Sequence, residues 1–184
     1  AQWIPLGLNL FSALCAVLAL GQLARSVALL PHNRSHEERE REKSSYSLLT
    51  IRSAWVPPVV AALVCGLQLT FWEHATNGTI EMFDLLLFAW VIRALLEYRI
   101  DGRDSWLFRA ALVFGVGMTN NFAMWGFLPV FIAALVWSRG LSFFNPRFLG
   151  WMALCVLIGL SLYLLPPLIA SLSKIEPVNF WQAL

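Results

Sequence analysis

Long apolar runs separated by short polar breaks make up most of this chain. A bilayer core about 30 Å thick needs about 20 apolar residues as helix, and four runs come close to that length: residues 4–29, 54–72, 80–96 and 148–171. Pro57 and Pro58 fall in the first turn of the second run, where proline is tolerated. Pro166 and Pro167 are expected to kink or end the last run.

A fifth apolar stretch, residues 106–137, is too long for one span. As a single helix it would measure about 48 Å at about 1.5 Å per residue. The polar break Thr119-Asn120-Asn121 divides it into 106–118 and 122–137. This pattern predicts a hairpin of two short helices, which must lean on neighbouring helices or sit where the bilayer is thin.

The composition agrees with a membrane protein. Of the 184 residues, 59% are hydrophobic and only 13% are charged, whereas soluble domains carry about a quarter charged residues. We therefore expect an all-α, polytopic transmembrane helical bundle. Cys15, Cys65 and Cys155 each lie inside an apolar run and are interpreted as small hydrophobic residues. No pattern typical of nucleic-acid binding, of a zinc site or of a phosphate loop is present.

The basic residues indicate the orientation. With about six spans, counting the short-helix hairpin as two, all of the 13 Lys and Arg residues except Lys174 lie at one face. The positive-inside rule makes that face cytoplasmic, so both chain ends are predicted on the outer side. The chain is treated as one transmembrane domain, 1–184, with a cytoplasmic loop at 31–52. The charges of residues 32–45 balance, which favours a solvated helical linker over a lipid-binding patch.

The stretch FWEHATNGTIEMFD (71–84) would then face the periplasm or lumen. Glu73 and His74 could simply be wetted residues of a polar loop. Glu81 and Asp84 begin the third run, three residues apart and so on one helix face. A carboxylate inside a span is costly and usually faces a polar cavity, although acids at a helix N-terminus also complement its dipole.

Three further observations complete the candidate chemistry. Asn120 and Asn121 suit a tight turn, but amides between two short helices also build polar pockets. Arg93 and Glu97, four residues apart, are expected to pair near the cytoplasmic end of their span. Two carboxylates and a histidine could hold a divalent cation, although their spacing matches no recognised metal motif.

Three segments together resemble a bacterial family of protein O-mannosyltransferase-like membrane proteins, which belong to the GT-C glycosyltransferases. They are LNLFSALCAVLAL (8–20), LQLTFWEHATNGTIEMFDLLLF (67–88) and GVGMTNNFAMWGFLPVF (115–131). Matching positions include an N-x-x-S-A-L opening at 9–14, Phe71-Trp72 followed by Glu81, and Gly115 with Asn120. Asn121 stands where the family has histidine, which argues against proton chemistry by this side chain.

The resemblance implies a polyprenyl-phosphate sugar donor and a protein or glycan acceptor. It also implies that the main catalytic carboxylate lies in an outer loop before Ala1, so this chain is expected to be an internal piece of a longer enzyme. A carboxylate base would deprotonate the acceptor hydroxyl. Within this chain, the residues expected to line the substrate cavity are Glu73, His74, Glu81, Asp84, Asn120 and Asn121.

We therefore expect the membrane core of an inverting transferase of a mannose-like sugar, in a bacterial inner membrane, with its acidic cluster facing the periplasm. Two alternatives stay open. A transporter or channel fragment would bind a proton or cation at the intramembrane acids, but needs polar groups near the bilayer midplane. In a non-catalytic assembly subunit, Glu81 and Asp84 would pair with basic residues of a partner.

Overall fold

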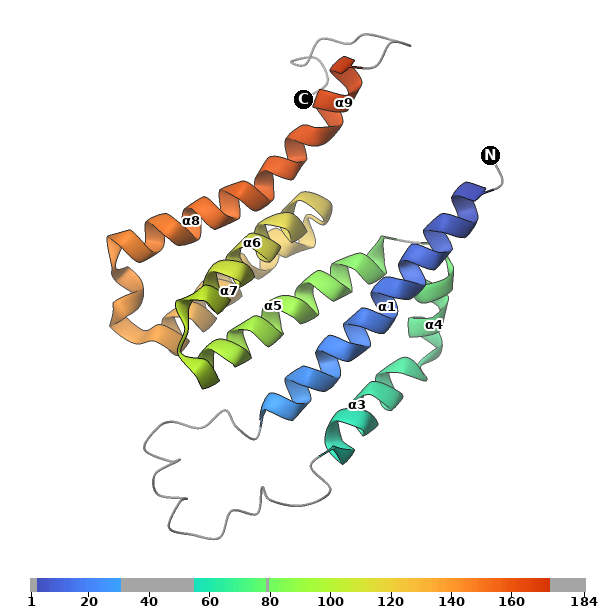
Figure 1. Cartoon of the computed structure of the whole chain (residues 1–184), viewed down its shortest axis with the longest axis horizontal. Coiled ribbons are helices and arrows are strands. Elements are labelled where there is room, and N and C mark those ends of the chain that lie inside the picture. The colour runs from blue at the N-terminus through green and yellow to red at the C-terminus, as the bar shows by residue number, and fades with distance from the viewer. Residues whose placement is uncertain (1–2, 31–54, 79, 173–184) are drawn as a thin grey trace. The chain divides into compact units, whose positions relative to one another are not determined.

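The structure is a computed structural model that describes residues 3–30, 55–78 and 80–172. Within these ranges every regular element is helical, which confirms the all-α prediction. The predicted loop at 31–52 and Lys174 lie outside the described residues. The elements, in chain order (Figure 1), are α1 (Trp3–Leu29), α3 (Val56–Gly66), α4 (Leu69–Thr76), α5 (Glu81–Asp101), α6 (Asp104–Asn120), α7 (Ala123–Arg139), η3 (Gly140–Phe144), α8 (Pro146–Leu160), η4 (Ser161–Leu164) and α9 (Leu165–Leu172).

Several of these helices are suited to a bilayer. In the described part of the chain, three are long and apolar enough to cross one: Trp3–Leu29, Ala123–Phe144 and Pro146–Ile169. The pair α3 and α4 would make a fourth span if taken together. Helix α5 carries acidic and basic side chains, and α6 is 17 residues long, so neither meets the same criterion. The chain is a membrane protein by these measures.

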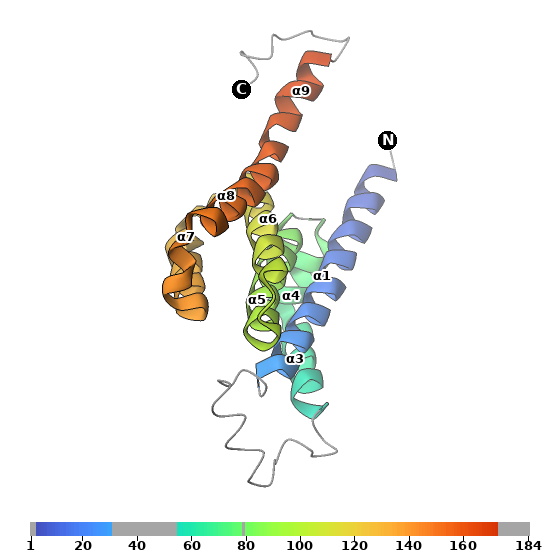
Figure 2. The same cartoon turned by 60° about the vertical axis from the view of Figure 1, so that its left-hand side comes forward.

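The described residues form two compact units, the first running to Ala110 and the second beginning at Ala111. In the first unit α1 packs along α5 and against α3 and α4, as both views show (Figures 1 and 2). Small side chains on α1, Cys15 and Ala16, meet Ala75 of α4 and Met82 of α5 in a buried cluster. Small residues let membrane helices approach closely, which explains this part of the apolar pattern of α1.

The second apolar run differs from the single helix that its composition suggests. Helix α3 ends at Gly66, Gln68 adopts an extended conformation, and α4 begins at Leu69 with its axis bent by 68° from that of α3. Gly66 lies at this break against α1, where an added Cβ would stand 3.1 Å from Leu20 Cδ1. Much of the polar stretch from Phe71 is consequently helical, in α4, rather than loop.

The predicted hairpin is present, and all of it from Ala111 onward belongs to the second unit. Helices α6 and α7 are separated at Asn121 and Phe122, and the rings of Phe114 and Phe131 stack with centroids 4.5 Å apart. Helix α8 crosses α6 closely, because a Cβ on Gly159 would stand 2.5 Å from the carbonyl oxygen of Leu112. Gly115 meets the backbone of Val156 in the same way. Glycines on both helices therefore allow contact between the two backbones.

The last apolar run is interrupted as its prolines predict. A 3₁₀ turn, η4 (Ser161–Leu164), separates α8 from α9, and Pro166 and Pro167 occupy the first turn of α9. Because proline has no amide hydrogen to donate, these two residues cannot continue the α-helical bonding of the preceding turn.

Candidate functional site

The polar stretch 71–84 lies at one end of the first unit. Helix α4 ends at Thr76, where the Asn77 amide donates to the Glu73 carbonyl at 3.1 Å. Gly78 then takes a left-handed conformation, with φ of +63°, which glycine adopts without steric cost. Helix α5 begins at Glu81 after this reversal. The turn brings the Nδ1 atom of His74 into contact with Oε2 of Glu81.

Two polar side chains of helix α1 lie against this turn. The Ser12 hydroxyl, 1% exposed, donates a 3.0 Å hydrogen bond to the main-chain carbonyl of His74. Three residues earlier on α1, the side-chain oxygen of Asn9 lies 2.5 Å from the place that a Cβ on Gly78 would occupy. The Ser12 bond therefore supports the backbone that carries His74, and the Asn9 side chain fills the space beside Gly78.

The pair is open to its surroundings. The His74 side chain is 44% exposed and that of Glu81 is 59% exposed, so a ligand could reach both. Asp84 lies one turn further along α5 and is half-buried, with its amide donating to the Ile80 carbonyl. Both acids fall in the first turn of α5, where negative charge complements the helix dipole. The arrangement offers a basic ring and two carboxylates to a polar ligand.

Of the six predicted site residues, the structure brings two, His74 and Glu81, into direct contact. Glu73 is exposed on α4, and its carbonyl accepts bonds from Asn77 and from the Thr76 hydroxyl. Asn120 and Asn121 belong to the second unit.

The turn interpretation of these asparagines fits Asn121. Its Oδ1 accepts a 2.9 Å hydrogen bond from the Ala123 amide, and its own amide donates to the Gly117 carbonyl at 3.0 Å. Asn121 thereby starts α7 as an asparagine turn residue does. Asn120 is exposed at the last position of α6.

Asn9 and Ser12 belong to the family pattern in the sequence, but they were not predicted as site residues. They could have been found, because Asn9 and Ser12 are three residues apart and so share one face in the otherwise apolar first half of α1. What they contact depends on the fold, since Gly78 and His74 lie more than 60 residues away in the chain.

No group of three or more His, Cys, Asp and Glu side chains that could hold a metal ion occurs within the ranges the structure describes. The contact between His74 and Glu81 unites only one nitrogen and one carboxylate.

A second polar cluster lies toward the other end of α1 and α5. Glu97 is buried, and its Oε1 lies 3.5 Å from Arg93 Nε, which confirms the predicted pair. The same oxygen accepts a 3.1 Å bond from Arg25 Nε of α1, and Arg93 donates to Gln22 at 2.9 Å. A buried carboxylate needs such partners, so this cluster fastens α1 to α5.

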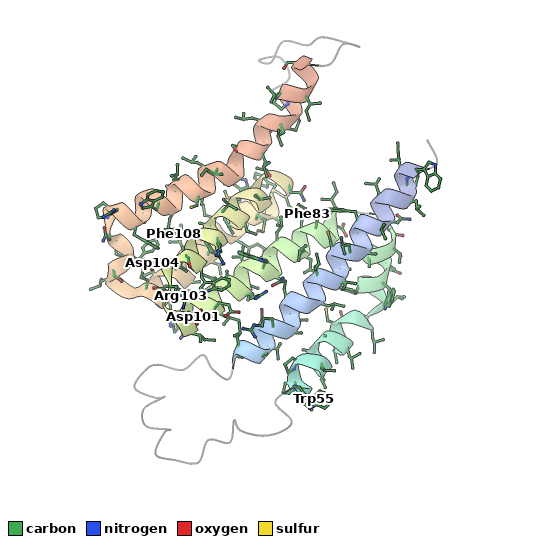
Figure 3. All side chains as sticks on the ribbon, in the orientation of Figure 1. Trp55, Phe83, Asp101, Arg103, Asp104 and Phe108 are labelled. Atoms are coloured by element: carbon green, nitrogen blue, oxygen red, sulfur yellow. The ribbon has the colours of Figure 1, made fainter. Side chains whose placement is uncertain are left out.

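The turn that follows α5 is also charged. Asp101, Arg103 and Asp104 gather there (Figure 3), and Gly102 between them takes φ of +68°. Asp101 accepts a 3.3 Å bond from the Trp106 indole. The two ends of α5 thus differ: acids with a histidine at one, and arginines with acids at the other.

The family model described as the protein O-mannosyl-transferase TMEM260 N-terminal domain matches residues 2–142. This match spans well over half of the chain. The chain belongs to that family. The resemblance to O-mannosyltransferase-like proteins, expected from the three segments, is therefore confirmed. No curated protein and no solved structure showed a match.

The O-mannosyl-transferase match includes both polar clusters of the first unit and continues through α7. Asn9, Ser12, His74 and Glu81 all lie inside it. Helices α8 and α9 lie beyond its last residue.

Proposed function

We propose that this chain is part of a glycosyltransferase that moves a mannose-like sugar from a polyprenyl-phosphate donor to a hydroxyl group of a protein or glycan acceptor. Membership of the O-mannosyl-transferase family supports the transferase activity. The single observation that carries the site is the contact between His74 and Glu81 at the turn held by Ser12.

The proposed topology has about six spans, with α5 and α6 included and both chain ends outside. Helix α5 is included despite its charges because residues 85–92 in its middle carry none, and a charge costs most at the centre of a span. Arg25, Arg93 and Arg99 lie toward the end of the first unit that the positive-inside rule makes cytoplasmic. The His74–Glu81 pair then faces the periplasm of a bacterial inner membrane, or the lumen.

In the proposed reaction the acceptor oxygen attacks the anomeric carbon, the bond to the phosphate breaks, and configuration inverts. Positive charge develops on the sugar, and negative charge grows on the departing phosphate. His74, held by Glu81, would donate a hydrogen bond to a phosphate oxygen, a stabilisation that grows with that charge. Asp84 would accept hydrogen bonds from sugar hydroxyls. The acceptor hydroxyl would give its proton to a carboxylate base, a role to which none of these residues is assigned.

The asparagines and Glu73 have lesser proposed roles. Asn120, exposed at the end of α6, would orient donor or acceptor. Asn121 would act through the shape of the α6–α7 turn, because its carbonyl oxygen caps the start of α7. Glu73 would contribute negative potential from α4.

Transport is less well supported than transfer. In the first unit, residues 85–92 of α5, between Asp84 and Arg93, are all apolar, whereas ion transporters place polar groups near the bilayer midplane.

The test uses the full-length protein in proteoliposomes, with tritiated mannosyl polyprenyl phosphate and a peptide that contains serine and threonine. The proposal predicts label on the peptide with the lipid-linked donor and none with a nucleotide-linked mannose. Transfer from the nucleotide sugar alone would contradict it. So would a proton current through the same vesicles without any transfer.

A further inference from the structure

A groove of about 660 Å³ lies in the second unit, lined by residues from the end of α6, the start of α7, the end of α8 and η4. Three aromatic side chains along it are exposed, namely Phe122, Trp125 and Tyr163. None of its lining residues, all of which the structure describes, carries a charge. Because tryptophan and tyrosine also gather at membrane interfaces, the rings alone do not identify a ligand.

Two hydroxyl side chains of the groove already use their hydrogens within the helices that carry them. Thr119 Oγ1 donates to the Val116 carbonyl at 2.6 Å. Ser161 Oγ donates to the Ile158 carbonyl at 2.7 Å. A hydroxyl has one hydrogen and two lone pairs, so each oxygen is left to a ligand as a hydrogen-bond acceptor.

The two prolines add a third acceptor. A helical carbonyl accepts from the amide three or four residues later, and for Tyr163 these residues are Pro166 and Pro167, which have no amide hydrogen. The Leu162 carbonyl, by contrast, receives the Leu165 amide. Irregular backbone at membrane depth is tolerated where it lines a polar cavity, and Tyr163 is one of the residues that line the groove. Its carbonyl therefore needs a donor from water or from a ligand.

These features select a ligand that is neutral and rich in hydroxyl groups. A phosphate or carboxylate has no hydrogen to donate to the acceptors and meets no cation among the lining residues. A hydrocarbon chain would leave the acceptors without partners. A saccharide meets both demands, because its hydroxyls donate to the acceptors and the C–H face of its ring packs on an aromatic side chain. Its oxygens can accept in turn from the Trp125 indole and the Tyr163 hydroxyl.

We propose that this groove binds a neutral saccharide of about two residues. The six carbons of benzene fill a cavity of ~150 Å³, so the twelve heavy atoms of a hexose need roughly 300 Å³, and two such rings fit in about 660 Å³. The inference rests on the proposed function for its topology, which puts this end of α6 on the outer side. Within the proposed transferase the ligand would be an acceptor glycan, because no lining residue would hold the phosphate of the donor.

Photo-cross-linking of the full-length protein in phosphatidylcholine nanodiscs tests this. The probe is a mannobiose glycoside with a diazirine in its short alkyl aglycone, and its adducts are mapped by mass spectrometry. We expect adducts within residues 118–125 and 157–164. Methyl mannoside should compete for them. Mannose 6-phosphate, which has the same ring and an anionic group, should compete at least about tenfold less well, since the groove offers its charge no partner.

A matched pair of variants adds a second readout. Trp125→Ala removes one ring of the groove and should weaken cross-linking by about tenfold or more, as truncation of a central aromatic side chain does. Trp137→Ala removes an exposed indole from the same helix but outside the groove, and should leave cross-linking unchanged. Thermal melting checks that both variants fold, and the wild-type adduct map and competition stand without either.

The outcomes separate the groove from the proposed transferase. Adducts that are missing from these segments, or that mannose 6-phosphate and methyl mannoside compete for equally, would overturn this inference. A serine-containing peptide that competes where methyl mannoside does not would show a peptide site instead. Sugar transfer from the lipid donor without adducts in these segments would overturn the inference and leave the transferase intact. Competed adducts without any transfer would support the saccharide groove and count against the transferase.

Discussion

The Ser12 hydroxyl on α1 donates a 3.0 Å hydrogen bond to the main-chain carbonyl of His74 on α4. This bond joins the first helix to the helix that carries half of the polar pair. Ser12→Ala should lower the free energy of unfolding by about 0.5–1 kcal/mol, the usual net value of such a bond. Because His74 would lose its support, the kcat/KM for sugar transfer should fall as well, and both are measurable on the purified protein.

Ser161→Ala serves as the control for that substitution. Its hydroxyl bonds to the Ile158 carbonyl within one helical stretch, so its loss breaks no contact between helices. An equal loss of stability in both variants would contradict the role assigned to Ser12.

Gly78 is predicted to tolerate no side chain. Gly78→Ala forces an L-residue into φ of +63°, which costs about 1–2 kcal/mol, and its Cβ would displace the Asn9 side chain. Gly102→Ala has a similar φ of +68° but nothing within 4 Å of the added Cβ. Thermal unfolding should therefore show a larger loss for Gly78→Ala.

Removing the Asn9 side chain should bring the stability loss of Gly78→Ala closer to that of Gly102→Ala. The double variant Asn9→Ala with Gly78→Ala is expected to recover part of the stability, leaving the cost of the backbone conformation. Identical unfolding of the Gly78 and Gly102 variants would show that Asn9 makes no significant contact with the turn.

Glu97 is predicted to matter most in the cluster that joins α1 to α5. It is 6% exposed and is held by Arg25 and Arg93. Glu97→Gln leaves Arg25 and Arg93 without the charge of their shared carboxylate, and a hydrogen bond to a charged group is worth about 1.5–3 kcal/mol. Arg25→Gln should cost about 0–1 kcal/mol, because the Arg25 side chain is 52% exposed and exposed pairs contribute little. Denaturant unfolding that ranks Arg25→Gln above Glu97→Gln would refute this ordering.

Helix contact in the second unit depends on glycine. A methyl group on Gly159 would stand 2.5 Å from the Leu112 carbonyl and 2.7 Å from the Val116 amide nitrogen. Gly159→Ala should destabilise this unit by about 1–3 kcal/mol, as overpacking does. Gly150→Ala on the same helix meets nothing within 4 Å and should be neutral, or gain up to about 1 kcal/mol from helix propensity. Thermal melts of the two variants that coincide would contradict this contact.

Local patterns predicted the helices well and their contacts poorly. The apolar run of α1, the paired short helices α6 and α7, and the start of α5 at Glu81 follow from hydropathy and turn residues. The Arg93–Glu97 pair follows from helical spacing and is confirmed. The bend after Gly66 could not be predicted, because composition alone does not distinguish a straight span from one broken by packing against Leu20.

The candidate site shows the same division. Glu81 and Asp84 stand out in the sequence because acids are rare in apolar helices. The partner of Glu81 does not, since the contact with His74 depends on the left-handed turn at Gly78. The contacts of Asn9 and Ser12 with this turn do not stand out in the sequence either. They join residues more than 60 positions apart, and only the tertiary fold decides which helix packs on α1.

The most direct measurement is sugar transfer from mannosyl polyprenyl phosphate by the full-length protein with the polar pair altered. His74→Gln and Glu81→Gln should each lower kcat/KM by at least about tenfold, since a lost hydrogen bond to a charged group is worth roughly 1.5–3 kcal/mol. The double variant should be little worse than either, because the two act together. Asp101→Asn, at the far end of α5, should retain wild-type transfer. Unchanged transfer in Glu81→Gln and His74→Gln would show that the reaction proceeds elsewhere.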